Sequence, residues 1–193
     1  MARSRKVEDD DAVEAAMYLF WDRGYGATGT RALEQKTGLT RFSLQTRFGG
    51  KKALFLAALD KYLEQVSKLK ISGDLDTIAQ WFEARTTAGF PYKAGVYGCL
   101  MQNTLIEFAN GDSDLARRSP QYYASISAMF LPALKRARNI GQLGTNDDIS
   151  AKAQTLSMAL LGLNTVIRGA RSNVAGAIVA ASIARTVRDW NRL

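Results

Sequence analysis

Residues 24–55 read GYGATGTRALEQKTGLTRFSLQTRFGGKKALF, a basic stretch with one helical period on either side of a turn. The turn lies at residues 38–40, where a glycine is followed by leucine and threonine. Leu33 lies on the first helical period, and Leu44 and Phe48 lie on the second at the i, i+4 spacing of one helix face. The pattern predicts two short amphipathic helices that cross on a small apolar core.

The second of these helices is expected to begin at Thr40, whose hydroxyl can cap free backbone N–H groups. The remaining N–H groups can point toward a phosphate. Its exposed side carries side chains that hydrogen-bond base edges or phosphates, and one ring that can pack on a thymine methyl: Arg41, Phe42, Ser43, Gln45, Thr46 and Arg47. Turn, cap and face together predict a helix-turn-helix that binds DNA, whereas the charges alone would also fit a solvated helix pair.

Positive charge is concentrated in the same segment. The chain has 193 residues, a formal net charge of +8 and no histidine. Residues 31–52 hold Glu34 as their only acidic side chain, against Arg31, Lys36, Arg41, Arg47, Lys51 and Lys52. Lys51 and Lys52 would open the next helix, where cations oppose the helix dipole unless an anion lies nearby. We therefore expect these charges to face a double-stranded DNA backbone.

A longer motif surrounds this segment, over residues 12–55. Its members are Ala16, Met17, Tyr18, Leu19 and Phe20, then Arg23, Gly24 and Tyr25, Ala27 and Thr28, Gly38, Leu39 and Thr40, and finally Leu44, Phe48 and Lys51. At these spacings the chain resembles the tetracycline-repressor (TetR) family of bacterial transcription regulators. The resemblance implies helices over about 8–23, 30–36, 40–47 and 51–68, the third being the recognition helix. It implies a DNA-binding head over residues 1–50 and a ligand-binding and dimerisation domain over residues 51–193.

The DNA-contact scheme of the head leaves alternatives open. We also count Thr28, Thr30 and Arg31 among its DNA-binding residues. Gln45 stands where the family usually has a tyrosine that contacts a phosphate, and it can instead bind an adenine edge. Glu34 stands where a small residue is usual, and it either adds a negative charge near DNA or points to solvent. A basic arm at residues 3–6 either reaches a DNA groove or is disordered.

Beyond residue 70 the pattern stays helical, without the period-two alternation of strands. Ser119 and Pro120 predict a helix start, because proline is favoured at the first helical position; this helix should run to about residue 139, with a bend at Pro132. Asp147 and Asp148 predict the start of another helix. The sequence therefore predicts an all-α chain of about nine helices, with a three-helix head at the amino terminus.

Several functional classes find no support in the sequence. Histidine is absent, cysteine occurs once, and no glycine-rich phosphate loop or metal-ligand cluster is present, so neither an enzyme nor a metal or cofactor site is expected. The amino terminus lacks the apolar region of a secretory signal, and no apolar stretch reaches the roughly 20 residues of a membrane span. We expect a cytoplasmic protein with no membrane partner.

The last two predicted helices carry the clearest indication of a homodimer. One helix has an apolar stripe of Leu156, Leu160, Leu163 and Ile167. The other has a small-residue face that permits close approach of a second helix, formed by Ala177, Ala180, Ala181 and Ala184. Packing within one subunit needs the same pattern. A two-fold dimer contacts two DNA half-sites about 34 to 36 Å apart and gains specificity, and the TetR resemblance independently implies a dimer through these helices.

The middle of the chain is the candidate site for a small-molecule effector. Its aromatic, soft and polar candidates are Trp81, Phe82, Arg85, Phe90, Tyr92, Tyr97, Cys99, Met101, Asn103, Glu107, Tyr122, Tyr123, Phe130 and Met158. Aromatic residues at helical spacing also form ordinary cores. In the TetR family, ligand binding in this region moves the fourth helix and the occupied protein leaves its operator, so the ligand must bind the released state better.

Two alternatives to a ligand-responsive repressor stay open. Residues 98–103 read GCLMQN and resemble a segment of one subgroup of TetR-like regulators, some of which sense electrophiles or oxidants through the cysteine. Cys99 would then be the sensor, although burial as a small hydrophobe is the commoner role of a lone cysteine. The second alternative is a helical protein-binding module without sequence-specific DNA binding, which Gln45 and Glu34 would favour.

Overall fold

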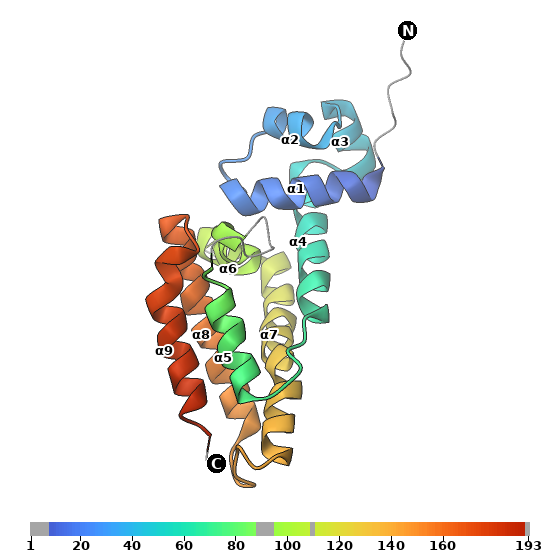
Figure 1. Cartoon of the computed structure of the whole chain (residues 1–193). Helices are drawn as coiled ribbons and strands as arrows, with labels where there is room; N and C mark the ends of the chain where they lie inside the picture. The colour runs from blue at the N-terminus through green and yellow to red at the C-terminus, as the bar shows by residue number, and fades with distance from the viewer. Residues whose placement is uncertain (1–7, 88–94, 109–110, 192–193) are drawn as a thin grey trace. The chain divides into compact units, whose positions relative to one another are not determined.

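The computed structural model describes residues 8–87, 95–108 and 111–191. Over these residues it contains nine α-helices and two short 3-10 helices, with no strand, so the all-α prediction is confirmed. The chain divides into two compact units, which are drawn together in Figure 1. The first unit comprises Met1–Gln65 and Leu100–Ala116, and the second comprises Val66–Cys99 and Arg117–Leu193. The predicted arm at residues 3–6 lies outside the described residues.

The first unit is built from helices that pack around an apolar core. It holds α1 (Asp9–Arg23), α2 (Thr30–Thr37), α3 (Arg41–Phe48), most of α4 (Lys51–Lys68), and α6 (Leu100–Glu107). α1 begins with three aspartates, which suit the positive end of a helix dipole. It buries Ala12, Ala16 and Phe20 at i, i+4 spacing and packs against α2 and α6. The four helix ranges implied by the family resemblance agree with the observed bounds to within one residue.

The second unit is a set of helices that lie side by side in Figure 1. It holds α5 (Leu75–Ala84), most of α7 (Ser113–Asn139), α8 (Ile149–Ala170) and α9 (Ala177–Arg188), with the 3-10 helices η1 (Gly95–Tyr97) and η2 (Val174–Gly176). α5 packs against α9, and α8 packs against α9, η1 and η2. Among the described helices of both units, none is long and apolar enough to cross a membrane.

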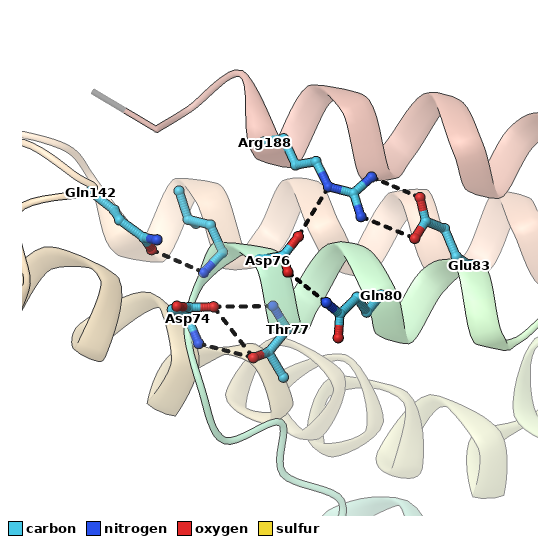
Figure 2. Close-up of polar contacts among 8 residues, drawn as sticks. Asp74, Asp76, Thr77, Gln80, Glu83, Gln142 and Arg188 are labelled. Carbon is cyan, nitrogen blue, oxygen red and sulfur yellow. Dashed lines mark hydrogen bonds and ion pairs between the residues drawn. The ribbon is translucent and has the colours of Figure 1, made fainter. Parts of the chain in front are cut away.

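A capping box fixes the start of α5 (Figure 2). The Asp74 carboxylate accepts a hydrogen bond from the Thr77 backbone N–H at 3.1 Å, and the Thr77 hydroxyl accepts one from the Asp74 N–H at 3.3 Å. Each side chain therefore satisfies a backbone group that the helix leaves open. The Gln142 side chain adds an acceptor for the Leu75 N–H at 3.2 Å, which joins the start of α5 to the loop after α7.

One arginine joins α9 to two acidic residues of α5 (Figure 2). The Arg188 guanidinium donates to both oxygens of Glu83, at 2.7 and 3.0 Å, and its Nε donates to Asp76 at 3.1 Å. The hydrogen bonds from Arg188 lower the pKa of Glu83, and those to Glu83 and Asp76 raise the pKa of Arg188. The bidentate geometry fixes the register of the two helices.

One predicted helix start is wrong. α7 begins at Ser113, so Pro120 lies inside the helix instead of at its first position. The reason is that the Asp112 side chain caps the earlier start, accepting hydrogen bonds from two backbone N–H groups of the first turn at 2.8 and 3.3 Å. Pro132 lies inside the same helix, as expected. The expected start of α8 is confirmed, because Asp148 caps it with an N–H···O distance of 3.0 Å.

Candidate DNA-binding surface

α2 and α3 form a helix-turn-helix around the residues that carry the sequence pattern. Gly38 ends α2 with a φ of 74°, a left-handed conformation that glycine adopts at little steric cost. Thr40 caps α3, because its hydroxyl oxygen accepts a hydrogen bond from the Ser43 backbone N–H at 3.1 Å. Leu33 and Leu44 are buried, with 1% and 3% of their surface exposed. The predicted turn, cap and buried positions of Leu33 and Leu44 are confirmed, whereas Phe48, expected on the same stripe, is half-buried.

The outer side of α3 presents an aromatic ring among polar side chains. The Phe42 side chain is 76% exposed. An apolar ring of this size gains free energy when a partner covers it, and thymine methyl groups in the major groove are suitable partners. Polar neighbours that are also exposed are Thr40, Arg41, Gln45 and Thr46, with Arg31 exposed on α2. Thr30, Ser43 and Glu34 are half-buried.

Thr28 lies in a different environment from the other proposed DNA-binding residues. It is 0% exposed, and its hydroxyl donates to the Gly24 carbonyl at 2.6 Å. A hydroxyl that is satisfied inside the protein in this way does not need water or a phosphate. The structure therefore places Thr28 in the core beside the α1–α2 turn, and its side chain does not belong to the exposed face.

Arg47 connects α3 to the start of α1. Its Nε donates to the Asp9 carboxylate at 2.7 Å, and its Nη2 donates to the same oxygen. The side chain is 25% exposed, and the guanidinium carbon lies 5.9 Å from the centre of the Phe48 ring. Sequence reasoning missed the role of Asp9, although an acidic residue at the start of α1 was a visible signal. Arg47 thus holds two helices of the head together.

Lys51 and Lys52, at the start of α4, also have partners within the first unit. The Lys51 ammonium lies 4.2 Å from the centre of the Tyr25 ring, a cation–π distance. The Lys52 ammonium lies 3.0 Å from Asp112 and 3.2 Å from Asp114. Hydrogen bonds raise the pKa of Lys52, and the bond to Asp112 has a larger effect than the bond to Asp114. These carboxylates supply the anions that cations at a helix start require.

The candidates for effector binding are divided between the two units. Met101, Asn103 and Glu107 belong to the first unit through α6, and the other described candidates belong to the second. Phe90 and Tyr92 lie outside the described residues.

Three aromatic candidates pack together in the second unit. Phe82 and Phe130 are both 0% exposed, and their parallel rings have centres 5.8 Å apart. The half-buried Trp81 meets both rings edge-on, at 5.2 and 6.0 Å. This packing fits an ordinary core. Tyr123 and Met158 are 40% and 54% exposed, so they lie on the surface of the unit.

A polar pair that the sequence analysis did not identify lies beside these rings. The Arg85 Nη2 donates to the side-chain oxygen of Asn164, a residue that is only 6% exposed. The guanidinium carbon of Arg85 lies 6.0 Å from the Trp81 ring centre. Because buried amides need partners, an asparagine within the apolar run of α8 was the signal that could have revealed this pair.

Cys99 is buried, with 2% of its surface exposed. Its Sγ lies 2.6 Å from the hydroxyl oxygen of Tyr122, which is also 2% exposed. A thiol enclosed in this way has little access to reagents in solvent, which supports the core role of Cys99 over the sensor role.

Glu107 lies at the α1–α2 turn. Its carboxylate accepts hydrogen bonds from the backbone N–H groups of Tyr25 and Gly26, at 2.9 and 2.5 Å. The residue proposed as a polar anchor for the effector is therefore bound to the helix-turn-helix head.

The predicted dimer residues are divided between the inside and the surface of the second unit. Six of them are buried within the unit, at most 7% exposed: Leu156, Leu160, Leu163, Ile167, Ala180 and Ala184. Burial of these six residues within the single chain is what packing inside one subunit requires. Ala177 and Ala181 are exposed. The exposed apolar side chains of the same region are Met158, Val166, Val174 and Ile178, of which Ile178 is 83% exposed.

Comparison with known proteins agrees with this geometry. Residues 12–58 match the model for bacterial regulatory proteins of the tetR family. The chain is 29% identical over 176 residues to the uncharacterized HTH-type transcriptional regulator YezE of Bacillus subtilis, covering 87% of this chain and 90% of that protein. It is 26% identical over 174 residues to the HTH-type transcriptional repressor ComR of Escherichia coli, covering 86% and 82%.

A solved structure extends the likeness over almost the whole chain. The crystal structure of a TetR-family transcriptional regulator from Cytophaga hutchinsonii superposes with a TM-score of 0.76 at 17% identity, covering 96% of this chain and 95% of that one. Residues 12–58 therefore match the amino-terminal domain of bacterial regulatory proteins of the tetR family, and the chain shares its fold with a TetR-family regulator.

Proposed function

We propose that the chain is a dimeric, ligand-responsive transcriptional regulator, a repressor that a small-molecule effector releases from a palindromic operator. The observation that carries this proposal is the outer face of α3, where Phe42 is 76% exposed on a helix that Thr40 caps. The match of residues 12–58 to the tetR family and the names of the two relatives support the same function. Operator DNA lies in the bacterial cytoplasm, so we propose that location.

The residues of the head that we propose to contact DNA divide into two sets by the contacts that their chemistry allows. Arg41 and Gln45 can hydrogen-bond base edges, and Phe42 can cover a thymine methyl. Residues suited to phosphates are Thr30, Arg31, Thr40, Ser43, Thr46 and Lys51. Arg47, held by Asp9, supports the geometry of α3.

The second unit supplies the proposed effector site. Arg85 and Asn164 form a polar pair beside the aromatic cluster of Trp81, Phe82 and Phe130, a combination typical of sites that bind small organic molecules. A ligand there regulates DNA binding only to the extent that its affinities for the bound and released states differ.

The proposed dimer surface combines exposed residues of α8, η2 and α9. Its members are Met158, Val166, Val174, Ala177, Ile178 and Ala181. We propose that these side chains adjoin one another, since contiguous exposed apolar surface is typical of an interface. A dimer through this surface can place two heads on two half-sites.

The resemblance of residues 98–103 to one TetR-like subgroup is part of this proposal, with Cys99 in a packing role. The contact between Cys99 and Tyr122 inside the second unit supports that role.

Selection of duplexes from a random pool by the full chain tests the proposed function. We expect a palindromic site that binds at least about 10³-fold more tightly than a scrambled duplex at the same salt concentration. Phe42→Ala should weaken binding to the selected site by about tenfold, and should leave binding to the scrambled duplex unchanged. Equal affinity for selected and scrambled duplexes would instead support the protein-binding module.

A further inference from the structure

α6 ends on a negative charge that its own helix disfavours. Glu107 is the last residue of α6. A carboxylate at this end of a helix faces the negative pole of the dipole, and the last turn of α6 holds no basic residue. The Glu107 carboxylate is therefore stabilised at this position by hydrogen-bond donors from another part of the chain.

Two successive backbone N–H groups provide these donors. The Tyr25 N–H lies 2.9 Å from Oε2 of Glu107, and the Gly26 N–H lies 2.5 Å from Oε1, across separations of 82 and 81 positions in the chain. Adjacent N–H groups that point to the same side of a turn form a concavity that binds anions. Both bonds involve an ionised acceptor, so they are stronger than bonds between neutral groups.

The glycines on either side of Tyr25 leave room for the carboxylate. A Cβ atom at Gly24 would lie 2.8 Å from Oε2 of Glu107, and one at Gly26 would lie 3.0 Å from Oε1. Any larger residue at either position would compete with Glu107 for this space. The Gly-Tyr-Gly sequence that precedes α2 is thus shaped to receive the end of α6.

Neighbouring contacts hold the same segment to the head. The Phe108 ring lies 5.3 Å from the Tyr25 ring and 6.0 Å from the Phe55 ring, measured between centres. Lys52 pairs with Asp112 at 3.0 Å. Phe108 and Asp112, which follow α6, therefore contact the α1–α2 turn and the start of α4.

We propose that Glu107 is a positioning residue for DNA binding. This inference rests on the proposed function. Its carboxylate holds the α1–α2 turn, and with it the start of α2, in the geometry that the helix-turn-helix needs to contact DNA. The residue lies outside the family-matched segment 12–58, so the DNA affinity of the head depends on a side chain from a distant part of the sequence.

Charge and positioning predict opposite effects when Glu107 is replaced. A carboxylate near a DNA-binding head repels phosphates, so removal of its charge alone raises DNA affinity. Loss of a positioning contact lowers it. Glu14→Gln is the matched control, because it removes one carboxylate from α1 of the same unit. The Glu14 partner, Lys61, keeps its bond to Asp10 at 2.7 Å.

The test compares Glu107→Gln, Glu107→Ala and Glu14→Gln in the full chain, on a duplex that the unmodified protein selects from a random pool. We expect Glu107→Gln to bind about fivefold more weakly than Glu14→Gln, with the same dependence on salt, and Glu107→Ala to bind more weakly still. The amide protons of Tyr25 and Gly26 should exchange faster with solvent in both Glu107 variants.

Three results would overturn the inference. One is a Glu107→Gln protein that binds as tightly as the Glu14→Gln control or more tightly. Another is unchanged exchange of the Tyr25 and Gly26 amides. The third is a loss of thermal stability with full affinity in the folded fraction, which a purely structural role would produce. If the unmodified protein selects no duplex, the proposed function fails, and the exchange measurement still tests the contact.

Discussion

The two units differ in which of their apolar side chains face solvent. In the first unit, Phe42 is 76% exposed on a short helix whose turn and cap fix its orientation. In the second unit, the stripe of Leu156 and Leu163 is buried, and Ile178 is 83% exposed on α9. The turn and the cap, which act within a few residues, therefore determine which side of α3 faces solvent. In contrast, packing between helices determines which sides of α8 and α9 are exposed.

The largest effect should come from truncating the core of the second unit. Phe82 is 0% exposed, and its ring lies parallel to that of Phe130 with centres 5.8 Å apart. Phe82→Ala removes this packing and leaves a cavity, so we expect the free energy of unfolding to fall by about 3–5 kcal/mol.

Denaturant unfolding of the full chain measures this loss, with Phe42→Ala as the control. The same substitution at the exposed Phe42 should change stability by less than about 0.5 kcal/mol. An equal loss of unfolding free energy in the two variants would contradict the distinction between a ring buried in the core and a ring exposed for DNA contact.

A charge on the proposed dimer surface should have the next largest effect. Ile178→Asp places a carboxylate where an apolar partner surface is expected, and should weaken dimerisation by about 2 kcal/mol. Ile106→Asp is the control, because Ile106 is 66% exposed on α6 of the first unit. Analytical ultracentrifugation over a range of protein concentrations distinguishes the two. A dimer that survives Ile178→Asp with unchanged affinity would rule out this surface.

Comparison of the two units also shows how far the sequence predicts the structure. The turn at Gly38, the cap at Thr40 and the α3 core residue Leu44 follow from spacing within a few residues, and all three are confirmed. The ranges of the first four helices were implied by the resemblance to the TetR family, and they agree with the observed bounds to within one residue.

Two contacts were not predicted from the sequence pattern, one across a long separation in the chain and one within a single helix turn. Glu107 has the chemistry of a ligand anchor in the sequence, yet it binds a turn 82 positions away. Pro120 resembles a helix start, but Asp112 caps α7 earlier. In both cases a side chain satisfies backbone groups that local periodicity does not reveal.

A glycine in the second unit provides a smaller test of close packing. A Cβ atom at Gly176 would lie 2.7 Å from Cδ1 of Leu163, so Gly176→Ala should destabilise the protein by about 1 kcal/mol. Gly169→Ala on α8 is the control, since a Cβ atom there would meet nothing within 4 Å. This control should be neutral or stabilising, because alanine favours a helix. Thermal unfolding of both variants measures the difference, and equal shifts would contradict close approach at Gly176.

The smallest effect concerns pH and the Arg188–Glu83 pair. Hydrogen bonds from Arg188 lower the pKa of Glu83 from its usual value of 4.5. A carboxyl group whose pKa is lower in the folded state stabilises the protein above the unfolded value, and this contribution disappears as pH falls through the folded value. Both side chains are 42% exposed, so water and salt keep the contribution small.

Glu83→Gln should therefore lower the midpoint of denaturant unfolding slightly at pH values well above 4.5, and the difference from the unmodified protein should vanish in acid. Arg188→Ala should give a similar profile, because the Glu83 carboxylate then loses its donor. Addition of Glu83→Gln to Arg188→Ala should remove little further stability, since the two substitutions break the same contact. A difference that grows on acidification would mean that Glu83 is destabilising when ionised, and the Arg188–Glu83 pair would then not stabilise the packing of α5 against α9.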